Sequence, residues 1–165
     1  MNSRSRILLA GKVLVAALFL TSCVTTPTGI QQSKVAIAQR IAAEPPGDYY
    51  IARRYFKPDF KFWGYVRRPG QPWSTAKLVM LNEEKKLAPD REQMNFGSDN
   101  NYQYKLYGYF SGETVYEPAS NSFYPEFVLK SYELMSTSPE PIFKSQMNSR
   151  AQAATTRYTI EKPQY

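Results

Sequence analysis

Residues 61–67 read KFWGYVR, and the alternation within this stretch is that of a β-strand with one side in a core. Successive side chains of a strand point to opposite faces of the sheet. Phe62, Gly64 and Val66 therefore share one face, which suits a protein interior. The opposite face carries large aromatic rings and cations, contributed by Lys61, Trp63, Tyr65 and Arg67.

The stretch 104–110, YKLYGYF, divides its side chains in the same way. Its apolar face consists of Tyr104, Leu106, Gly108 and Phe110. Its cationic and aromatic face consists of Lys105, Tyr107 and Tyr109. Glycine within a strand often marks a bulge or a sharp bend of a closing sheet, so we expect such irregularities at Gly64 and Gly108.

Other segments rich in β-branched and aromatic residues surround these two stretches. We expect strands at about 48–56, 61–68, 76–82, 103–110, 113–117 and 125–135. Arg68-Pro69-Gly70-Gln71 fits a type II turn, and Ser111-Gly112 can close a tight hairpin. The predicted fold class is mainly β. Residues 47–136 form a small antiparallel barrel or sandwich, OB-like or SH3-like, preceded by one short amphipathic helix.

That helix is expected over residues 31–43. Its apolar stripe, at spacings of three and four residues, is formed by Ile30, Lys34, Ile37 and Ile41. Pro45-Pro46 end it. Residues 23–46 thus comprise a flexible tether and the helix. Residues 137–165 form a tail that we expect to be partly disordered, in which residues 155–161 could add an edge strand.

The amino terminus has the order of a secretory signal. Arg4, Arg6 and Lys12 precede the apolar run 13–20, and no acidic residue occurs before Cys23. Lys12 leaves this run well short of the roughly 20 apolar residues that cross a bilayer. Residues 1–22 are therefore expected to be a signal peptide that directs the chain out of the cytoplasm.

Leu20-Thr21-Ser22-Cys23 resembles the lipobox of bacterial lipoproteins. The resemblance covers these four positions and the signal before them, and Cys23 is the only cysteine of the chain. It implies that the Cys23 thiol carries a diacylglycerol, that the mature chain begins there, and that lipid holds it on a membrane. Val24 after the cysteine, in place of aspartate, favours the outer membrane over the inner membrane.

The residue types that are missing exclude most enzyme designs. The chain has no histidine, and its single cysteine is the expected acylation site. The mature protein therefore lacks the Ser-His-Asp triad, the Cys-His pair and the usual zinc ligands. We expect no cofactor and no bound metal. Without the three basic residues of the signal, the formal net charge falls from +7 to +4, a modest basic excess.

The cationic and aromatic faces are the candidate binding surface. The predicted ligand-binding residues are Arg53, Arg54, Lys61, Trp63, Tyr65, Arg67, Lys105, Tyr107 and Tyr109. Aromatic rings pack on the apolar faces of sugars and other planar groups, and neighbouring cations hold phosphate or carboxylate. Nucleic acid often binds such surfaces, but an exported lipoprotein meets cell-wall glycan, anionic lipid headgroups or another envelope protein. We therefore expect no nucleic acid partner.

The predicted function is a non-catalytic binding or assembly module in the cell envelope. Two alternatives stay open: a structural subunit of an envelope protein complex, and a carboxylate-dependent glycan hydrolase. A further interpretation needs no ligand. In it, Trp63, Tyr65, Tyr107 and Tyr109 form a second packing layer under the 31–43 helix, and the arginines are solvated.

Overall fold

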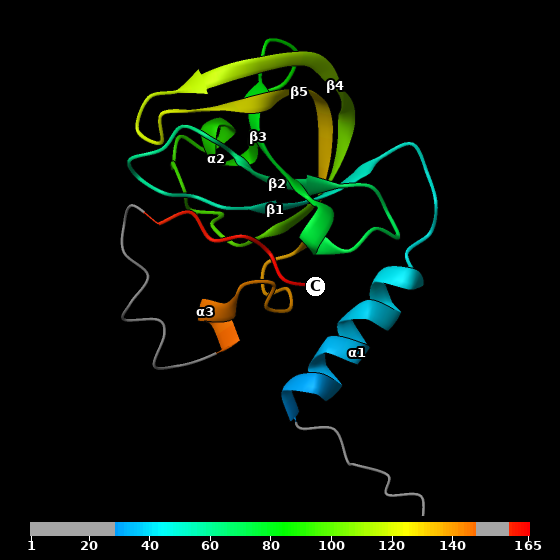
Figure 1. Ribbon diagram of the computed structural model, residues 1–165. Helices are drawn as coiled ribbons and strands as arrows, with labels where there is room; N and C mark the ends of the chain where they lie inside the picture. Colours follow the sequence, from blue (N-terminus) through cyan, green and yellow to red (C-terminus); the bar gives the residue numbers. More distant parts are fainter. Residues whose placement is uncertain (1–28, 148–158) are drawn as a thin grey trace, which may run out of the picture.

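The computed structural model describes residues 29–147 and 159–165 (Figure 1). Helix α1 (Gly29–Ala42) comes first. The strands that follow are β1 (Tyr50–Arg54), β2 (Gly64–Arg67), β3 (Lys77–Asn82), β4 (Gln103–Glu117) and β5 (Ser122–Ser136). Shorter helical elements are η1 (Trp73–Thr75), α2 (Pro89–Glu92) and α3 (Lys144–Met147). The prediction of a mainly β fold preceded by one helix is confirmed.

The strands form a closed barrel in the order β1-β2-β3-β5-β4, and β4 pairs with β1 to complete it. The sequence favours either an OB-like or an SH3-like barrel, and this closed five-stranded barrel corresponds to the OB-like one. The pairs of β1 with β2, β1 with β4, β2 with β3 and β4 with β5 are antiparallel. However, β3 and β5 are parallel. The chain leaves β3 through residues 83–102 before it enters the β4–β5 hairpin, so β5 returns beside β3 in the same direction.

Alternation along the strands fills the barrel interior. The buried cluster inside it includes Ala52, Val66, Val79, Leu106, Phe127 and Leu129. Ala52 pairs with Val66 on one side and with Tyr104 on the other, which places these three residues on the same inner face. The predicted inward orientation of Val66, Tyr104 and Leu106 is therefore confirmed.

Gly108 lies where β4 and β5 change register. The shift falls between Tyr107 and Gly108, and a Cβ atom added to Gly108 would lie 2.1 Å from the carbonyl oxygen of Val128. Only glycine lets the two strands approach this closely. The predicted irregularity at Gly108 is confirmed.

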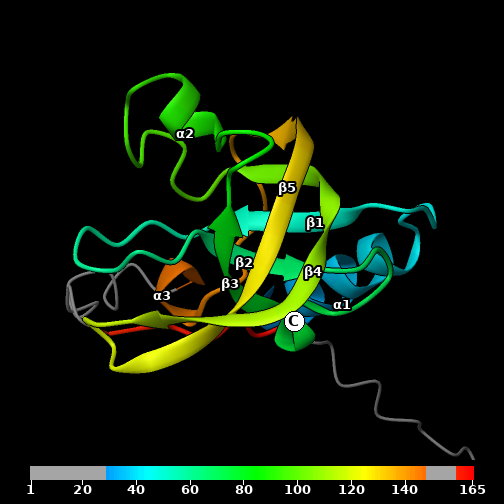
Figure 2. The same ribbon diagram turned by 90° about the horizontal axis from the view of Figure 1, so that it is seen from above.

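The predicted hairpin at Ser111-Gly112 is wrong. β4 runs through both residues, and the turn to β5 falls at residues 118–121. Gly112 has a φ of +93° and lies within the register shift between Phe110 and Thr114. A positive φ suits a bulge as well as a tight turn. The glycine therefore lies in a continuous, curved β4–β5 ribbon, which extends beyond the barrel in Figure 2.

A second apolar layer covers the outer face of β1 and β2. Ile37 and Ile41 of α1 are buried in it, together with Ile142 and Phe143 from the tail. Residues 159–165 pack against the same layer and contain no strand. Figure 1 shows α1, α3 and the carboxyl-terminal segment on the same side of the barrel.

Some predictions concern residues that the structure does not describe. The signal peptide at residues 1–22, the lipobox and Cys23 lie outside the described residues, as do residues 155–158 of the proposed edge strand. Within residues 29–147 and 159–165, no helix combines the length and the apolar character needed to span a bilayer.

Candidate functional site

The nine predicted ligand-binding residues do not form one continuous surface. Strand pairing and alternation place six of them on the outer face of the barrel, namely Arg53, Tyr65, Arg67, Lys105, Tyr107 and Tyr109. The other three meet in a pocket at one end of the barrel, and they are Arg54, Lys61 and Trp63.

The part of the outer face on β1 and β2 is covered. Tyr65 is buried against Tyr55 and Phe143, and its hydroxyl donates a hydrogen bond to the carbonyl of Glu161. Arg53 and Arg67 are only 1% and 3% exposed. The ligand-free interpretation, a second packing layer, therefore describes Tyr65 well. It does not describe Arg53 and Arg67, which are buried and not solvated.

The part of the outer face on β4 is open, and its polar groups bind one another. The Nζ atom of Lys105 lies 3.2 Å from Glu133 Oε2, and the Tyr107 hydroxyl donates a 2.8 Å hydrogen bond to Glu133 Oε1. These contacts hold the pKa of Glu133 below its ordinary value. Tyr109 is partly exposed, with the ammonium group of Lys130 5.1 Å from its ring centre. The cation of Lys105 thus already has a partner.

The strongest candidate site is a pocket of about 430 Å³ between the β1–β2 loop (residues 55–63) and the segment 83–102, which carries α2. We call it the loop pocket. Its aromatic lining is Phe56, Phe60, Phe62, Trp63 and Phe96. Its charged lining is Arg54, Lys61, Glu83, Asp90 and Arg91. Rings and charges of both signs therefore meet at one opening.

Trp63 enters this pocket because the strand alternation stops before β2 begins at Gly64. Its ring centroid lies 6.0 Å from that of Tyr104 within the barrel cluster, whereas Phe62 joins the outer layer. The parity assignment of Trp63 and Phe62 is thus wrong. The β1–β2 loop is irregular at this point, and a Cβ atom on Gly64 would lie 2.3 Å from the Arg53 carbonyl oxygen.

A buried ion cluster supports the pocket. Arg54 binds Asp90 through Nη2 at 2.8 Å and Asp99 through Nε at 3.2 Å. The Tyr104 hydroxyl donates a 3.0 Å hydrogen bond to Asp99, and the Gly97 N–H donates one of 3.0 Å to Asp90. The cluster ties the segment 83–102 to β1 and so holds the two walls of the loop pocket together.

The two aspartates respond differently to burial. Burial raises the pKa of Asp99 above its ordinary value, although Arg54 opposes the shift. Burial would also raise the pKa of Asp90, but the Gly97 N–H and Arg54 hold it below its ordinary value. Arg54 therefore keeps charge on two carboxylates that burial alone would protonate more readily.

Lys61 stands exposed at the rim of the loop pocket, and Glu117 fixes its backbone. The buried Glu117 carboxylate accepts hydrogen bonds from the N–H groups of Ala119 and Ser120 at 3.2 and 2.7 Å. Burial would raise the pKa of Glu117, but its hydrogen bonds with Ser120, Ala119 and the Lys61 backbone hold that pKa below its ordinary value. The end of β4 thus positions the pocket rim.

The pocket's other carboxylate is Glu83, which binds Arg91 with 2.9 Å between Oε2 and Nε. Burial raises the pKa of Glu83, and Arg91 opposes the shift. Glu83 and Asp90 are therefore each paired with an arginine, and neither stands as an isolated acid.

The sequence pattern does not mark Phe96 and Arg91 as site residues, because residues 82–101 have the polar composition of a loop between strands. The available signal was Phe96 itself, an aromatic residue among polar neighbours. In the structure Phe96 is 67% exposed at the pocket mouth, and the Arg91 guanidinium lies 5.8 Å from its ring centre.

The chemistry available at the loop pocket is stacking and ion pairing. Across residues 29–147 and 159–165, no three His, Cys, Asp or Glu side chains gather in a way that could hold a metal ion. Comparisons with protein-family models, with curated proteins and with solved structures find no match to this chain. The functional conclusion therefore depends on the geometry of the site.

Proposed function

We propose that this chain is a lipoprotein of the bacterial cell envelope whose barrel is a non-catalytic binding module. Lipid on Cys23 holds it on a membrane, with the outer membrane favoured, and the loop pocket binds an anionic segment of cell-wall glycan. The observation that carries the proposal is a pocket lined by five aromatic rings, with Phe96 largely exposed at its mouth and Lys61 exposed at its rim.

The pocket chemistry matches a sugar that bears acidic groups. Phe96 leaves most of its ring in water, and covering an aromatic side chain of this size is worth about 1.5–3 kcal/mol. Lys61, which is exposed at the pocket rim, can hold a carboxylate or phosphate beside the ring. Trp63 also lines the pocket, and its buried indole N–H has no acceptor within the described residues.

The position of the pocket favours a glycan over lipid headgroups. Gly29 is the sixth residue after Cys23, so α1 begins within about 20 Å of the residue that carries the acyl chains. Figures 1 and 2 show α2, which forms one wall of the loop pocket, and α1 on opposite sides of the barrel. The pocket therefore faces away from the anchored end of the domain.

The pairing of the acids supports a binding role rather than hydrolysis. A glycan hydrolase needs one carboxyl group as an acid and a second as a base or nucleophile. In the loop pocket Asp90 is held by Arg54 and the Gly97 N–H, and Glu83 by Arg91. Both carboxylates already bind groups of the chain itself.

One observation favours the second candidate, a structural subunit of an envelope complex. Tyr116 and Phe123 are cross-strand neighbours on the β4–β5 ribbon, with ring centroids 5.2 Å apart, and both are exposed. An exposed aromatic pair on a protruding ribbon suits contact with another protein. Cross-linking from position 123 in intact cells would then give a discrete protein adduct.

Acylation is the first testable element of the proposal. Cells that express the chain and receive labelled palmitate are expected to incorporate label into the protein, and Cys23→Ser is expected to abolish incorporation because it removes the thiol. Gel fluorography of the purified protein measures the label. An unlabelled wild-type chain, or label that persists in Cys23→Ser, would contradict lipidation at this residue.

Glycan binding is the second testable element of the proposal. Phe96→Ser and Lys61→Gln are each expected to reduce retention of the full chain on purified insoluble wall glycan by about tenfold, which corresponds to roughly 1.4 kcal/mol. Phe96→Ser removes a stacking ring, and Lys61→Gln removes an ammonium group. The bound fraction is measured by sedimentation across a range of glycan concentrations.

Phe123→Ser is the matched control, because Phe123 is 68% exposed, almost the same as Phe96, but lies on the β4–β5 ribbon. It is expected to retain wild-type binding. Equal losses for Phe96→Ser and Phe123→Ser would indicate nonspecific adhesion and contradict a site at the loop pocket.

A further inference from the structure

A second cavity, of about 270 Å³, lies between α1 and the outer face of the barrel. We call it the arginine cavity. Residues that line it include Arg53, Arg67, Trp73, Gln103, Ser136 and Ser138. Each of these side chains carries an N–H or O–H group that can donate a hydrogen bond to an anion, and the carboxylates of Glu44 and Glu140 line the cavity as well. The cavity shares no residue with the loop pocket.

Arg53 is a buried cation whose hydrogen-bonded partners are all neutral. Its guanidinium donates to Asn101 Oδ1 at 3.0 Å, to the Glu140 carbonyl at 3.0 Å and to Gln103 Oε1 at 2.9 Å. A guanidinium has five N–H groups, so two remain. One of these, on the buried Nε, has no acceptor within the described residues. Burial of a charge without an ionic partner is costly.

Arg67 beside it is neutralised within the protein. Both terminal nitrogens of Arg67 bind the Glu44 carboxylate, each at 2.6 Å. The Cζ atoms of Arg67 and Arg53 lie 4.3 and 5.3 Å from the Trp73 ring centre. Both guanidinium groups thus lie against the Trp73 ring, but only Arg67 binds a carboxylate directly. The positive charge of Arg53 has no directly bound anionic partner.

The pKa of Arg53 agrees with a positive charge that has no directly bound anionic partner. Burial, and secondarily repulsion by Arg67, lower the pKa of Arg53 to about 9, against the attraction of Glu140. Arg53 therefore remains charged at neutral pH. An anion beside it would remove the repulsion that its present surroundings leave uncompensated.

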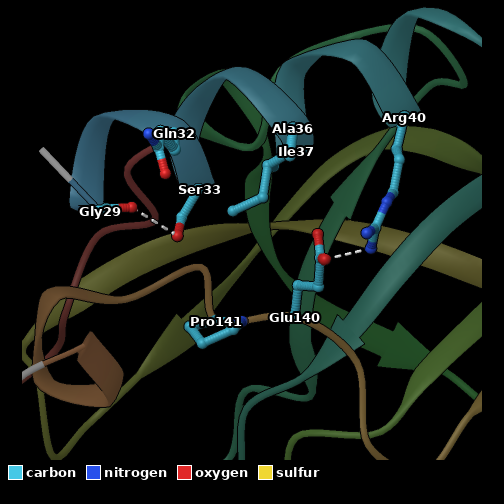
Figure 3. A pocket seen from close by; sticks show the side chains of 8 residues that line it. All are labelled: Gly29, Gln32, Ser33, Ala36, Ile37, Arg40, Glu140 and Pro141. Atoms are coloured by element: carbon cyan, nitrogen blue, oxygen red, sulfur yellow. Dashed lines mark hydrogen bonds and ion pairs between the residues drawn. The ribbon is translucent and has the colours of Figure 1, made fainter. Parts of the chain in front are cut away.

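The arginine cavity adjoins a second groove. Figure 3 shows Arg40 of α1 reaching across to Glu140, at a groove between α1 and the segment that contains Pro141. Arg40 and Glu140 line both this groove and the arginine cavity. Their side chains are 68% and 39% exposed, and an exposed ion pair of this kind separates at little cost. Separation of this pair would connect the groove with the arginine cavity.

We propose that the arginine cavity binds a small oxyanion, a phosphate or carboxylate group, with Arg53 as its principal ligand. Gln103 and the hydroxyls of Ser136 and Ser138 line the same space and can add hydrogen bonds. This site is separate from the loop pocket, so a test of one proposal does not decide the other.

The two tryptophans of the chain allow the sites to be observed separately, because Trp73 lines the arginine cavity and Trp63 the loop pocket. We would titrate the full-length Trp63→Phe chain, in a nonionic detergent, with sodium phosphate and, in a second arm, with sodium acetate at constant ionic strength. Trp73 fluorescence is expected to change saturably in at least one arm. The arm that saturates identifies the chemical group.

Two variants in the Trp63→Phe background test the assignment to Arg53. Arg53→Gln is expected to weaken anion binding by at least about tenfold. Arg68→Gln, which removes the same charge from the neighbouring exposed residue, is expected to leave the affinity unchanged. No saturable change in either arm, or equal affinities for these two variants, would overturn the proposal.

Glu44→Gln separates a ligand role from a structural role. It removes the internal carboxylate that competes for Arg67 and is expected to tighten anion binding several-fold. A purely structural role for the arginines predicts no such gain. If Arg53→Gln does not fold, tighter binding by Glu44→Gln supports the proposal, and unchanged or weaker binding overturns it.

Discussion

Replacement of Gly108 by alanine is expected to lower the free energy of unfolding by about 3 kcal/mol or more. The added Cβ would lie 2.1 Å from the Val128 carbonyl oxygen and 2.7 Å from the Phe127 ring, and the first of these atoms belongs to the backbone of the paired strand. Rotation of a side chain cannot relieve that contact, so the β4–β5 pairing must shift. Thermal unfolding followed by circular dichroism should show a midpoint lower by about 10 °C.

Gly112→Ala is the matched control on the same strand. Gly112 has a φ of +93°, but a Cβ atom there would meet no other atom within 4 Å. The Gly112→Ala substitution is therefore expected to lower the free energy of unfolding by only about 1–2 kcal/mol, because alanine disfavours a positive φ. If Gly108→Ala unfolds no earlier than Gly112→Ala, the close strand approach described for Gly108 is incorrect.

Replacement of Arg54 by methionine is expected to lower the free energy of unfolding by about 3–5 kcal/mol at pH 7. The change leaves Asp90 and Asp99 buried without the cation that binds both. Urea unfolding gives the free energy. The control is Arg91→Met, which breaks the partly exposed pair with Glu83 and is expected to cost at most about 1 kcal/mol.

The Arg54→Met loss should also depend on pH. Without Arg54, the folded-state pKa of Asp90 and of Asp99 rises above the unfolded-state value, so the folded variant binds more protons than its unfolded state. The penalty is then relieved as the pH falls through the raised pKa values. The difference between wild type and variant should be smaller at pH 5 than at pH 7. A difference that stays constant would mean that Arg54 acts by packing alone.

The barrel could be predicted because alternation is a local property of each strand. Val66, Tyr104 and Leu106 point inward as the pattern indicates. The hairpin at Ser111-Gly112 failed because the backbone freedom of glycine serves bulges and turns equally. The parallel pairing of β3 with β5 depends on where a long excursion returns, which no local pattern encodes.

The site was harder to predict than the fold. Parity correctly put Tyr65, Arg67, Lys105 and Tyr107 on one side of their strands, yet it carries no information on what covers that side. The tail supplied Ile142 and Phe143 to the covering layer although it is poor in apolar residues overall. Phe96 belongs to the loop pocket only because the Arg54 cluster folds its segment back onto β1.

The most direct test of the binding function uses the full-length Trp73→Phe chain, in which Trp63 alone reports on the loop pocket. It is titrated with soluble wall fragments that carry free carboxylates, and separately with a neutral chito-oligosaccharide of equal length. We expect saturable quenching or a spectral shift with the acidic fragments, about tenfold weaker binding of the neutral sugar, and a similar loss in Lys61→Gln. Unchanged Trp63 fluorescence at saturating acidic fragment, or equal affinity for the neutral sugar, would contradict the account.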